Sequence, residues 1–210
     1  METLPRSPAA LAALVVAVLA LPAAAQFTDR PYLDRPLGDH PRIGDPEAHD
    51  AVDLFSRLCV STRGDRSRAI EILGDGDSAI EKLDERTVRQ FQGGRVGGAA
   101  WTIRMPLGEK LIVEFEPSGS CIVRAPRVDA LSLEDGLRNF LAEIAANGEF
   151  KVRRAGDDEK TVDKRKYHLV TYSMRLPDTD QKVEVAVATT EAKDAFVQGS
   201  LTYEILAGGP

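Results

Sequence analysis

The segment AAWTIRMPLGEKLIVEFEPSGSCIVRA, residues 99–125, decides the fold class. Apolar residues occupy alternate positions in three short runs, and this period of two is typical of β-strands with one buried face. Pro106-Leu107-Gly108 and Pro117-Ser118-Gly119 separate the runs and are typical of tight turns. The segment therefore predicts three antiparallel strands that share one apolar face.

A helical period precedes these strands. Asp45 is suited to an N-cap and Pro46 to the first helical turn. Apolar residues then follow at helical spacing, at Ala48, Val52, Phe55 and Cys59. We predict two further helices, over Arg66–Leu73 and from Ser78 to about Gln90, the second opening with a capping-box pattern.

The C-terminal half repeats the same change of period. Ser132 is predicted to cap an amphipathic helix that Asn147-Gly148 ends. Further strands are predicted near Phe150–Arg154, Tyr167–Leu176, Val183–Thr189 and Leu201–Leu206. The order α-βββ-α-βββ predicts an α+β fold, with the N-terminal helices and one internal helix packed on one face of an antiparallel sheet of six or seven strands. We predict that residues 46–207 form a single domain.

The first residues of the chain predict export. An apolar run follows Arg6, Pro22 breaks it, and Ala23-Ala24-Ala25 supplies the small residues of a cleavage site. The run is too short to span a bilayer. We therefore expect a signal peptide over residues 1–25, cut after Ala25, and a periplasmic or secreted protein with no membrane span in its mature form.

A proline-rich segment follows the predicted cleavage site. Asp-Arg-Pro or Asp-His-Pro recurs every five residues, and each proline keeps the preceding residue out of the helical region. Residues 26–45 are therefore predicted to form an extended arm. It is either a solvated spacer or a segment that docks on a partner through Tyr32, Leu33, Leu37 and Ile43.

Composition limits the classes of partner. With 43% hydrophobic and 29% charged residues, the chain has the composition of a folded domain. Its formal net charge of −6 argues against nucleic acid and anionic lipid surfaces as partners of the chain as a whole.

The two cysteines, Cys59 and Cys121, are predicted to form a disulfide. Cys59 lies on the apolar side of its helix and Cys121 on the apolar face of its strand. Paired cysteines close in an oxidising compartment. Two thiolates cannot complete a four-ligand zinc site, and no histidine lies at ligand spacing, so no metal site is predicted. A nucleophilic cysteine would need a histidine nearby in space, which the sequence leaves open.

The flanks of the cysteines carry a resemblance. LFSRLCVS at 54–61, a gap of about sixty residues and EFEPSGSCIV at 114–123 resemble a family of small uncharacterised exported proteins and lipoproteins of Gram-negative bacteria. Where members of that family carry a lipid-modified cysteine after the signal peptide, this chain has none. The resemblance implies no activity and no site residues.

The histidines and carboxylates predict no catalytic residue and no cofactor. His40 lies in the arm, His49 in the first turn of a helix, and His168 on a strand face with apolar neighbours, where a partly buried structural role is expected. The acidic runs at 157–159 and 178–180 are expected at turns. Two carboxylates from distant parts of the chain could still form an acid–base site.

Two classes of function follow. The first is a non-catalytic envelope module that binds another envelope protein through the arm residues Tyr32 and Leu37, a glycine-rich loop at 92–98, and an exposed sheet face bearing Thr102, Arg104, Lys110 and Glu114. The second is a hydrolase of unrecognised type, which would need a concave site with converging titratable groups. A small-ligand carrier would need a cavity between sheet and helix.

Overall fold

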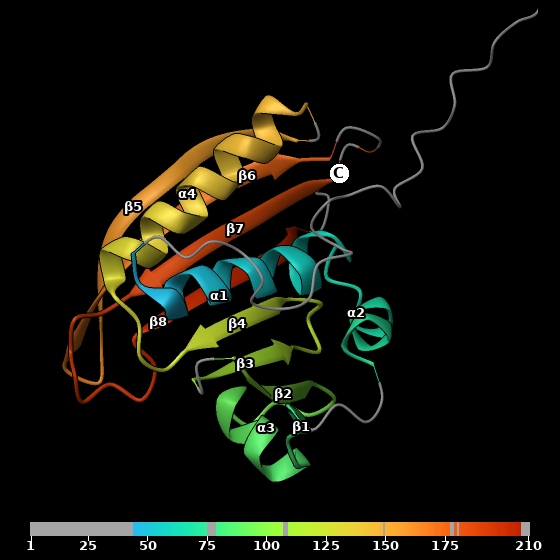
Figure 1. Cartoon of the computed structure of the whole chain (residues 1–210), viewed down its shortest axis with the longest axis vertical. Coiled ribbons are helices and arrows are strands. Elements are labelled where there is room, and N and C mark those ends of the chain that lie inside the picture. The colour runs from blue at the N-terminus through green and yellow to red at the C-terminus, as the bar shows by residue number, and fades with distance from the viewer. Residues whose placement is uncertain are drawn as a thin grey trace, which may run out of the picture. The chain divides into compact units, whose positions relative to one another are not determined.

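The computed structural model of the chain describes residues 44–74, 79–106, 109–148, 150–176, 179 and 181–206. Within these residues, eight strands form one antiparallel sheet in the order β1-β2-β3-β4-β8-β7-β6-β5 (Figure 1). The strands are β1 (Ile80–Lys82), β2 (Ala99–Arg104), β3 (Lys110–Phe115), β4 (Cys121–Ala125), β5 (Lys151–Val162), β6 (Arg165–Arg175), β7 (Lys182–Thr189) and β8 (Gly199–Leu206). The helices are α1 (Pro46–Phe55), α2 (Arg66–Leu73), α3 (Glu85–Phe91) and α4 (Ala130–Ala146), with a π-helical turn, η1 (Ser56–Val60), after α1. The predicted α+β class is confirmed, with one strand more than the six or seven expected.

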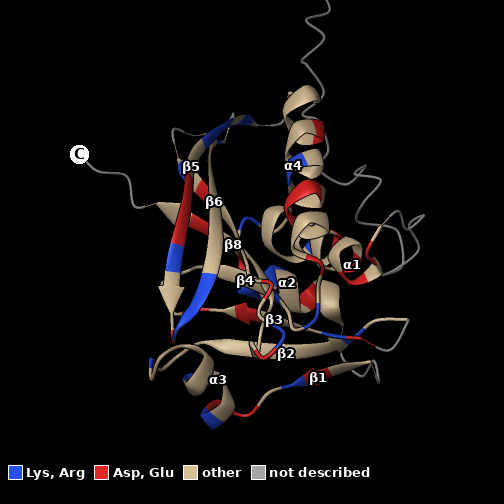
Figure 2. Cartoon of the chain, turned by 90° about the vertical axis from the view of Figure 1, so that its left-hand side faces the viewer, with Lys and Arg blue, Asp and Glu red and all other residues tan. Residues whose placement is uncertain are grey.

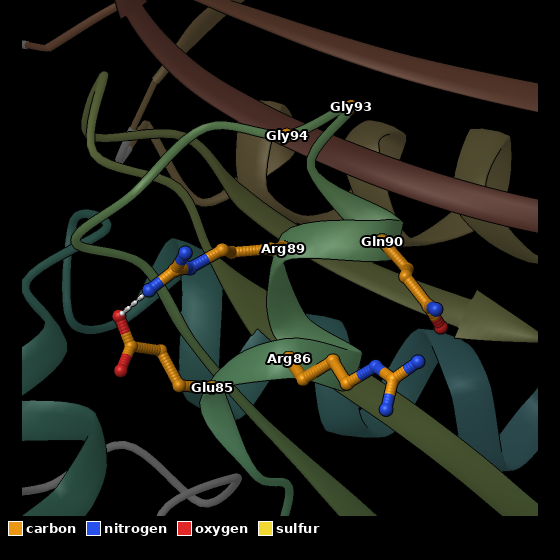
Figure 3. A pocket seen from close by; sticks show the side chains of 6 residues that line it. All are labelled: Glu85, Arg86, Arg89, Gln90, Gly93 and Gly94. Atoms are coloured by element: carbon orange, nitrogen blue, oxygen red, sulfur yellow. Dashed lines mark hydrogen bonds and ion pairs between the residues drawn. The ribbon is translucent and has the colours of Figure 1, made fainter.

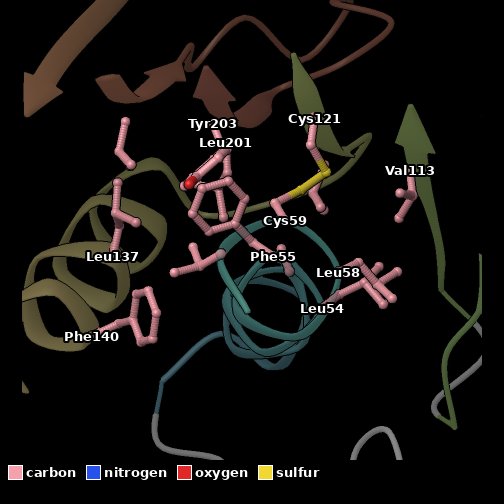
Figure 4. Packing of buried hydrophobic residues seen from close by; sticks show 14 of the residues in the cluster. Leu54, Phe55, Leu58, Cys59, Val113, Cys121, Leu137, Phe140, Leu201 and Tyr203 are labelled. Atoms are coloured by element: carbon pink, nitrogen blue, oxygen red, sulfur yellow. A yellow bond between two sulfur atoms is a disulfide. The ribbon is translucent and has the colours of Figure 1, made fainter. Parts of the chain in front are cut away.

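Helices α1 and α4 cover one face of the sheet. Helix α1 packs on β4 and β8, α4 packs on β7 and β5, and the two helices contact each other (Figure 1). A Cβ atom on Gly136 of α4 would lie 3.2 Å from Val52 Cγ2 of α1, so glycine at this position allows the close approach. Apolar side chains from both helices and the central strands fill the space beneath, as Figure 4 shows for Phe55, Leu137 and Tyr203.

A disulfide joins the end of the first helical segment to the middle of the sheet. Cys59 of η1 is bonded to Cys121 of β4, with 5.4 Å between their Cα atoms (Figure 4). Both residues are fully buried in the main core. The two cysteines therefore face each other from the helix and the strand, and the predicted disulfide is present.

Helix α3 lies on the opposite face of the sheet, so the prediction that the N-terminal helices all pack on one face is wrong for this helix. It packs a small second core onto β2 and β3, made by Val88, Ala100 and Ile112 with Leu83 and Phe91 at its edge. The predicted helix from Ser78 to Gln90 is wrong in its first half, because residues 80–82 pair with β2 as strand β1. The N-cap is Asp84, whose Oδ1 accepts the backbone N–H groups of Arg86 and Thr87.

Two other boundaries differ from the prediction. Helix α4 begins at Ala130 with Asp129 as its N-cap, and Ser132 contributes a backbone N–H to that cap (2.8 Å) instead of capping the helix itself. Strand β5 continues to Val162, so the acidic run at 157–159 lies within a strand and not at a turn. The turn comes at Asp163 and Lys164, whose φ values of 49° and 65° are those of a tight two-residue hairpin.

The predicted signal peptide and the arm up to residue 43 lie outside the described residues, as do Tyr32, Leu33, Leu37 and Ile43. Asp45, the last residue of the predicted arm, caps α1 as expected by accepting the Glu47 N–H at 3.1 Å. Among the helices that the structure describes, none combines the length and the apolar character needed to cross a membrane.

Candidate functional site

One group of titratable side chains joins α4 to β5 and β6. His168 Nδ1 lies 2.8 Å from Glu134 Oε1, and His168 Nε2 lies 2.7 Å from Asp157 Oδ1. The three residues are separated by 34 and 11 positions in sequence. The fold therefore places one imidazole between two carboxylates from different elements.

Neighbouring polar groups hold both carboxylates. The Thr189 hydroxyl donates to Glu134 Oε1 at 2.5 Å, and Thr189 is paired directly with His168 across β6 and β7. Arg154 forms an ion pair with Asp157 within β5. Each carboxylate thus has a second partner besides the imidazole, and this fixes the orientation of the cluster.

The electrostatics of the cluster favour the imidazolium. The hydrogen bonds that His168 donates to Glu134, the larger effect, and to Asp157 raise the pKa of His168 above its usual 6.5. The hydrogen bond from His168 also lowers the pKa of Asp157. Both ring nitrogens of a histidine are donors only in the imidazolium. In this geometry His168 therefore carries a positive charge and connects α4 to the sheet through two hydrogen bonds. It would become a general base only by giving up one of its carboxylate partners.

His168 is partly buried, as the sequence predicted, with 38% of its side chain exposed. Its two partners were missed. Asp157 was expected at a turn, and Glu134 lies one residue from Leu133 on the edge of the apolar stripe of α4. No local pattern connects these positions, because only the packing of α4 on the sheet brings Glu134 to the imidazole.

A second charged pair lies on the opposite face, beneath α3. Glu114 of β3 is fully buried, and its Oε2 accepts from Arg124 Nε at 2.9 Å and Nη2 at 2.7 Å. The Arg124 guanidinium lies 5.9 Å from the centre of the Phe91 ring. The prediction that Glu114 belongs to an exposed interaction surface is therefore wrong, because α3 and Arg124 cover it.

Arg104 and Lys110 occupy the ends of β2 and β3 on this same face, directly opposite each other, and both are exposed. Thr102, two residues from Arg104 along β2, is half-buried. The glycine-rich loop that precedes β2 is held by the buried Gln92, whose Nε2 donates to the Phe115 carbonyl at 3.2 Å.

Beyond α3, the same face of the sheet has no helix among the described elements. Figure 2 shows α1 and α4 on one side of β5 and β6. We call the other side of β5–β8 the open face. The strand register places small side chains along its middle and charged ones toward its ends. Its members include Lys151, Arg153, Asp158, Lys160, Tyr167, Leu169, Thr171, Ser173, Arg175, Lys182, Glu184, Ala186, Ala188, Ser200, Thr202, Glu204 and Leu206.

An aromatic pair lies at the margin of the open face. Phe196, in the loop between β7 and β8, is 71% exposed, and its ring centre lies 5.8 Å from that of Phe91 in α3. Phe91 is the last residue of α3 and also contacts Arg124 of β4. The aromatic pair therefore lies at the edge of the region that α3 covers. Exposed aromatic side chains held in a cluster are typical of protein-binding surfaces.

A shallow pocket of about 570 Å³ lies on α3 and the turn that follows it. Its lining residues are Glu85, Arg86, Arg89, Gln90, Gly93 and Gly94 (Figure 3). Arg89 is paired with Glu85 at 2.6 Å, while Arg86 and Gln90 extend in another direction (Figure 3). This pocket is separate from His168, so it does not complete a catalytic site there.

A third buried or partly buried carboxyl group, that of Glu47, lies at the start of α1. Glu47 is 6% exposed and accepts the Arg127 N–H at 2.9 Å. Burial raises the pKa of Glu47 to about 7, and the negative charges of Asp45 and Glu109 act in the same direction. Glu47 therefore titrates near neutral pH and is a source of pH-dependent stability.

No protein-family model matches the chain, and no curated protein or solved structure matches it either.

Proposed function

We propose that this chain is an exported, non-catalytic binding module of the cell envelope, and that it binds another protein at the margin of its open face. The observation that carries the proposal is the Phe196–Phe91 pair. Exposing 71% of a phenylalanine to water is unfavourable for the free protein, and a partner that buries the ring would recover that free energy.

The loop geometry supports a ready-made surface. The backbone N–H of Thr190 donates to the Gln198 carbonyl at 2.8 Å, which closes the loop that carries Phe196. The Ala195 carbonyl, next to Phe196, accepts from Arg127 Nη1 at 3.0 Å. The ring is therefore presented by a braced loop, and a partner would not have to order it on binding.

Site-specific photo-crosslinking in cells tests this proposal. A photoreactive phenylalanine analogue at position 196 should give a discrete adduct with one protein. Leu131 of α4 is 70% exposed and provides the matched control position, which should give no such adduct. Phe196→Ser should abolish the interaction without changing the melting temperature. Equal crosslinking from positions 131 and 196 would contradict the proposal.

The hydrolase alternative rests on Glu134, His168 and Asp157. Replacing His168 by Gln separates the two functions, because a binding module needs the cluster only for folding. We expect His168→Gln to cost about 1–3 kcal/mol of stability and to leave complementation of a deletion strain intact once expression is matched. A stable variant that fails to complement would favour the hydrolase, since a general base contributes about a hundredfold or more to rate.

A further inference from the structure

Four basic residues gather at one end of the open face, away from Phe196. Lys151 begins β5, Arg175 ends β6 and Lys182 begins β7. The strand register pairs Lys151 with Arg175, and Arg175 with Lys182. Arg153, two residues along β5, points to the same face, and all four are exposed. Figure 2 shows basic residues at the start of β5, before the acidic stretch. We call these four residues the cation row.

The cation row is unfavourable for the protein alone. Neighbouring strands lie about 4.8 Å apart, so the backbones of three basic residues follow one another at that spacing. Like charges in directly opposed cross-strand positions are destabilising. The ion pairs that the structure describes on β5 and β6 involve other positions: Arg154 with Asp157, Lys166 with Glu159, Arg165 with Asp194, and His168 with Glu134 and Asp157. Among the described residues of these strands, the nearest open-face acid is Glu184, which lies two residues from Lys182 along β7 and is paired across the strands with Ser173.

The whole chain carries a net charge of −6, so a concentration of basic residues at one end of the sheet is not a consequence of composition. Among the strand residues that the structure describes, the cross-strand partners of Lys151, Arg175 and Lys182 include no acid. The net charge argues against general attraction to anionic surfaces. It does not argue against one local anion site, because at physiological salt charges more than about 8 Å away are largely screened.

We propose that the cation row binds a phosphate group. A phosphate presents several oxygens around one centre, and three cations at strand spacing can share them. Arg175, in the middle of the row, can bind two oxygens through its planar guanidinium, while Lys151 and Lys182 act as flanking point charges. The site lies on an exposed sheet end, so the rest of the ligand can project into solvent. A phosphate ester in solution and the headgroup of an anionic phospholipid both fit this description.

The test compares two double variants with equal loss of charge. Arg175→Gln with Lys182→Gln removes two members of the row. Lys160→Gln with Lys193→Gln removes two exposed lysines outside it. The folded chain is titrated at low ionic strength with inorganic phosphate, followed by amide chemical shifts. In parallel it is sedimented with phosphatidylcholine vesicles that contain or lack phosphatidylglycerol.

We expect binding to be weakened about tenfold or more in the row variant and to stay within twofold of wild type in the control. Binding to inorganic phosphate assigns the site to a soluble phosphate ester. Binding to vesicles that contain phosphatidylglycerol, without binding to inorganic phosphate, assigns it to a lipid headgroup. Absence of binding in both arms, or an equal loss in both variants, would overturn the proposal.

Discussion

Strand β7 shows the difference between the two faces of the sheet within eight residues. Val183, Val185 and Val187 point toward the helices and are buried, whereas Glu184, Ala186 and Ala188 alternate with them and are half-buried on the open face. The same strand therefore contributes large apolar side chains to one face and small or charged side chains to the other. On the covered face each position is constrained by packing, while the open face tolerates change.

We expect this difference between the two faces to separate residues that stabilise the fold from residues that bind a partner. Substitutions on the covered face should alter the free energy of unfolding, and substitutions on the open face should alter interactions with little effect on folding. Glu114 and Arg124 lie between these two cases. They belong to the face opposite α1 and α4, but α3 covers them.

The largest effect is expected at the disulfide of the covered face. Cys59 and Cys121 close a loop with a sequence separation of 62, which corresponds to about 4 kcal/mol in the chain-entropy model. Replacing both with alanine should lower the free energy of unfolding in urea by about that amount. Adding reductant should destabilise wild type and leave the double-alanine variant unchanged. A difference below about 1 kcal/mol would mean that packing alone holds η1 against β4.

The next largest effect on stability is expected beneath α3, on the face of the sheet opposite α1 and α4. Arg124→Met would leave the Glu114 carboxylate buried without its ion-pair partner, at a cost of about 3 kcal/mol. Adding Glu114→Gln should recover most of that loss. Arg138→Met is the control, because Arg138 and Asp135 form an exposed pair at 2.8 Å that should contribute less than about 1 kcal/mol. Equal costs at Arg124 and Arg138 would show that Glu114 is solvated in solution.

These residues show which features of the structure can be predicted from the sequence. The three-strand meander and the two cysteines were predictable, because a period of two and the adjacent turns are local signals. The burial of Glu114 was not, because it depends on α3 lying across β2 and β3. The helix expected from Ser78 failed for a related reason. Its capping pattern is local, but pairing of Ile80–Lys82 with β2 satisfies the same backbone groups through tertiary contact.

The candidate site was even less accessible from sequence. His168 could be placed on a strand face from its alternation with Val170 and Tyr172. Its two carboxylates lie on a helix and on an edge strand, and nothing in the spacing of Glu134 or Asp157 connects them with it. The long β5 was also underestimated, because its charged residues do not alternate with apolar ones as those of β7 do.

A pH-dependent effect is expected on the helix-covered side. A carboxyl whose pKa is raised in the folded state stabilises the fold below its unfolded pKa, and this contribution is lost as the pH rises through the folded value. For Glu47 the window runs from about 4.5 to about 7. The raised pKa of His168 acts in the same direction above 6.5. We therefore expect the free energy of unfolding to be about 2 kcal/mol lower at pH 8 than at pH 5.

Substitution of Glu47 identifies the source of this dependence. Glu47→Gln can still accept the Arg127 N–H, and it should remove most of the difference between pH 5 and pH 8. Glu81→Gln, at an exposed position of β1, is the control and should retain it. The carboxyls with lowered pKa values, such as those of Asp84 and Asp129, stay ionised across this range and do not oppose the trend. A flat profile in wild type would place Glu47 in contact with solvent.

The smallest effect, and the one of opposite sign, is expected on the open face. Lys182 faces Arg175 across the strand pair, so Lys182→Gln relieves repulsion within the cation row. We expect it to raise the free energy of unfolding by about 0.3 kcal/mol at low ionic strength. The gain should disappear in about 1 M salt, where the Debye length falls to about 3 Å. Lys160→Gln on β5 is the control, because Lys160 is paired with Tyr167 and not with a cation.

A stabilisation by Lys182→Gln that persists in high salt would point to strand propensity as its cause. A loss of stability would mean that Lys182 has an acidic partner in solution. A salt-sensitive gain confined to the row would show that the open face keeps an arrangement that opposes folding, as expected of a surface retained for binding.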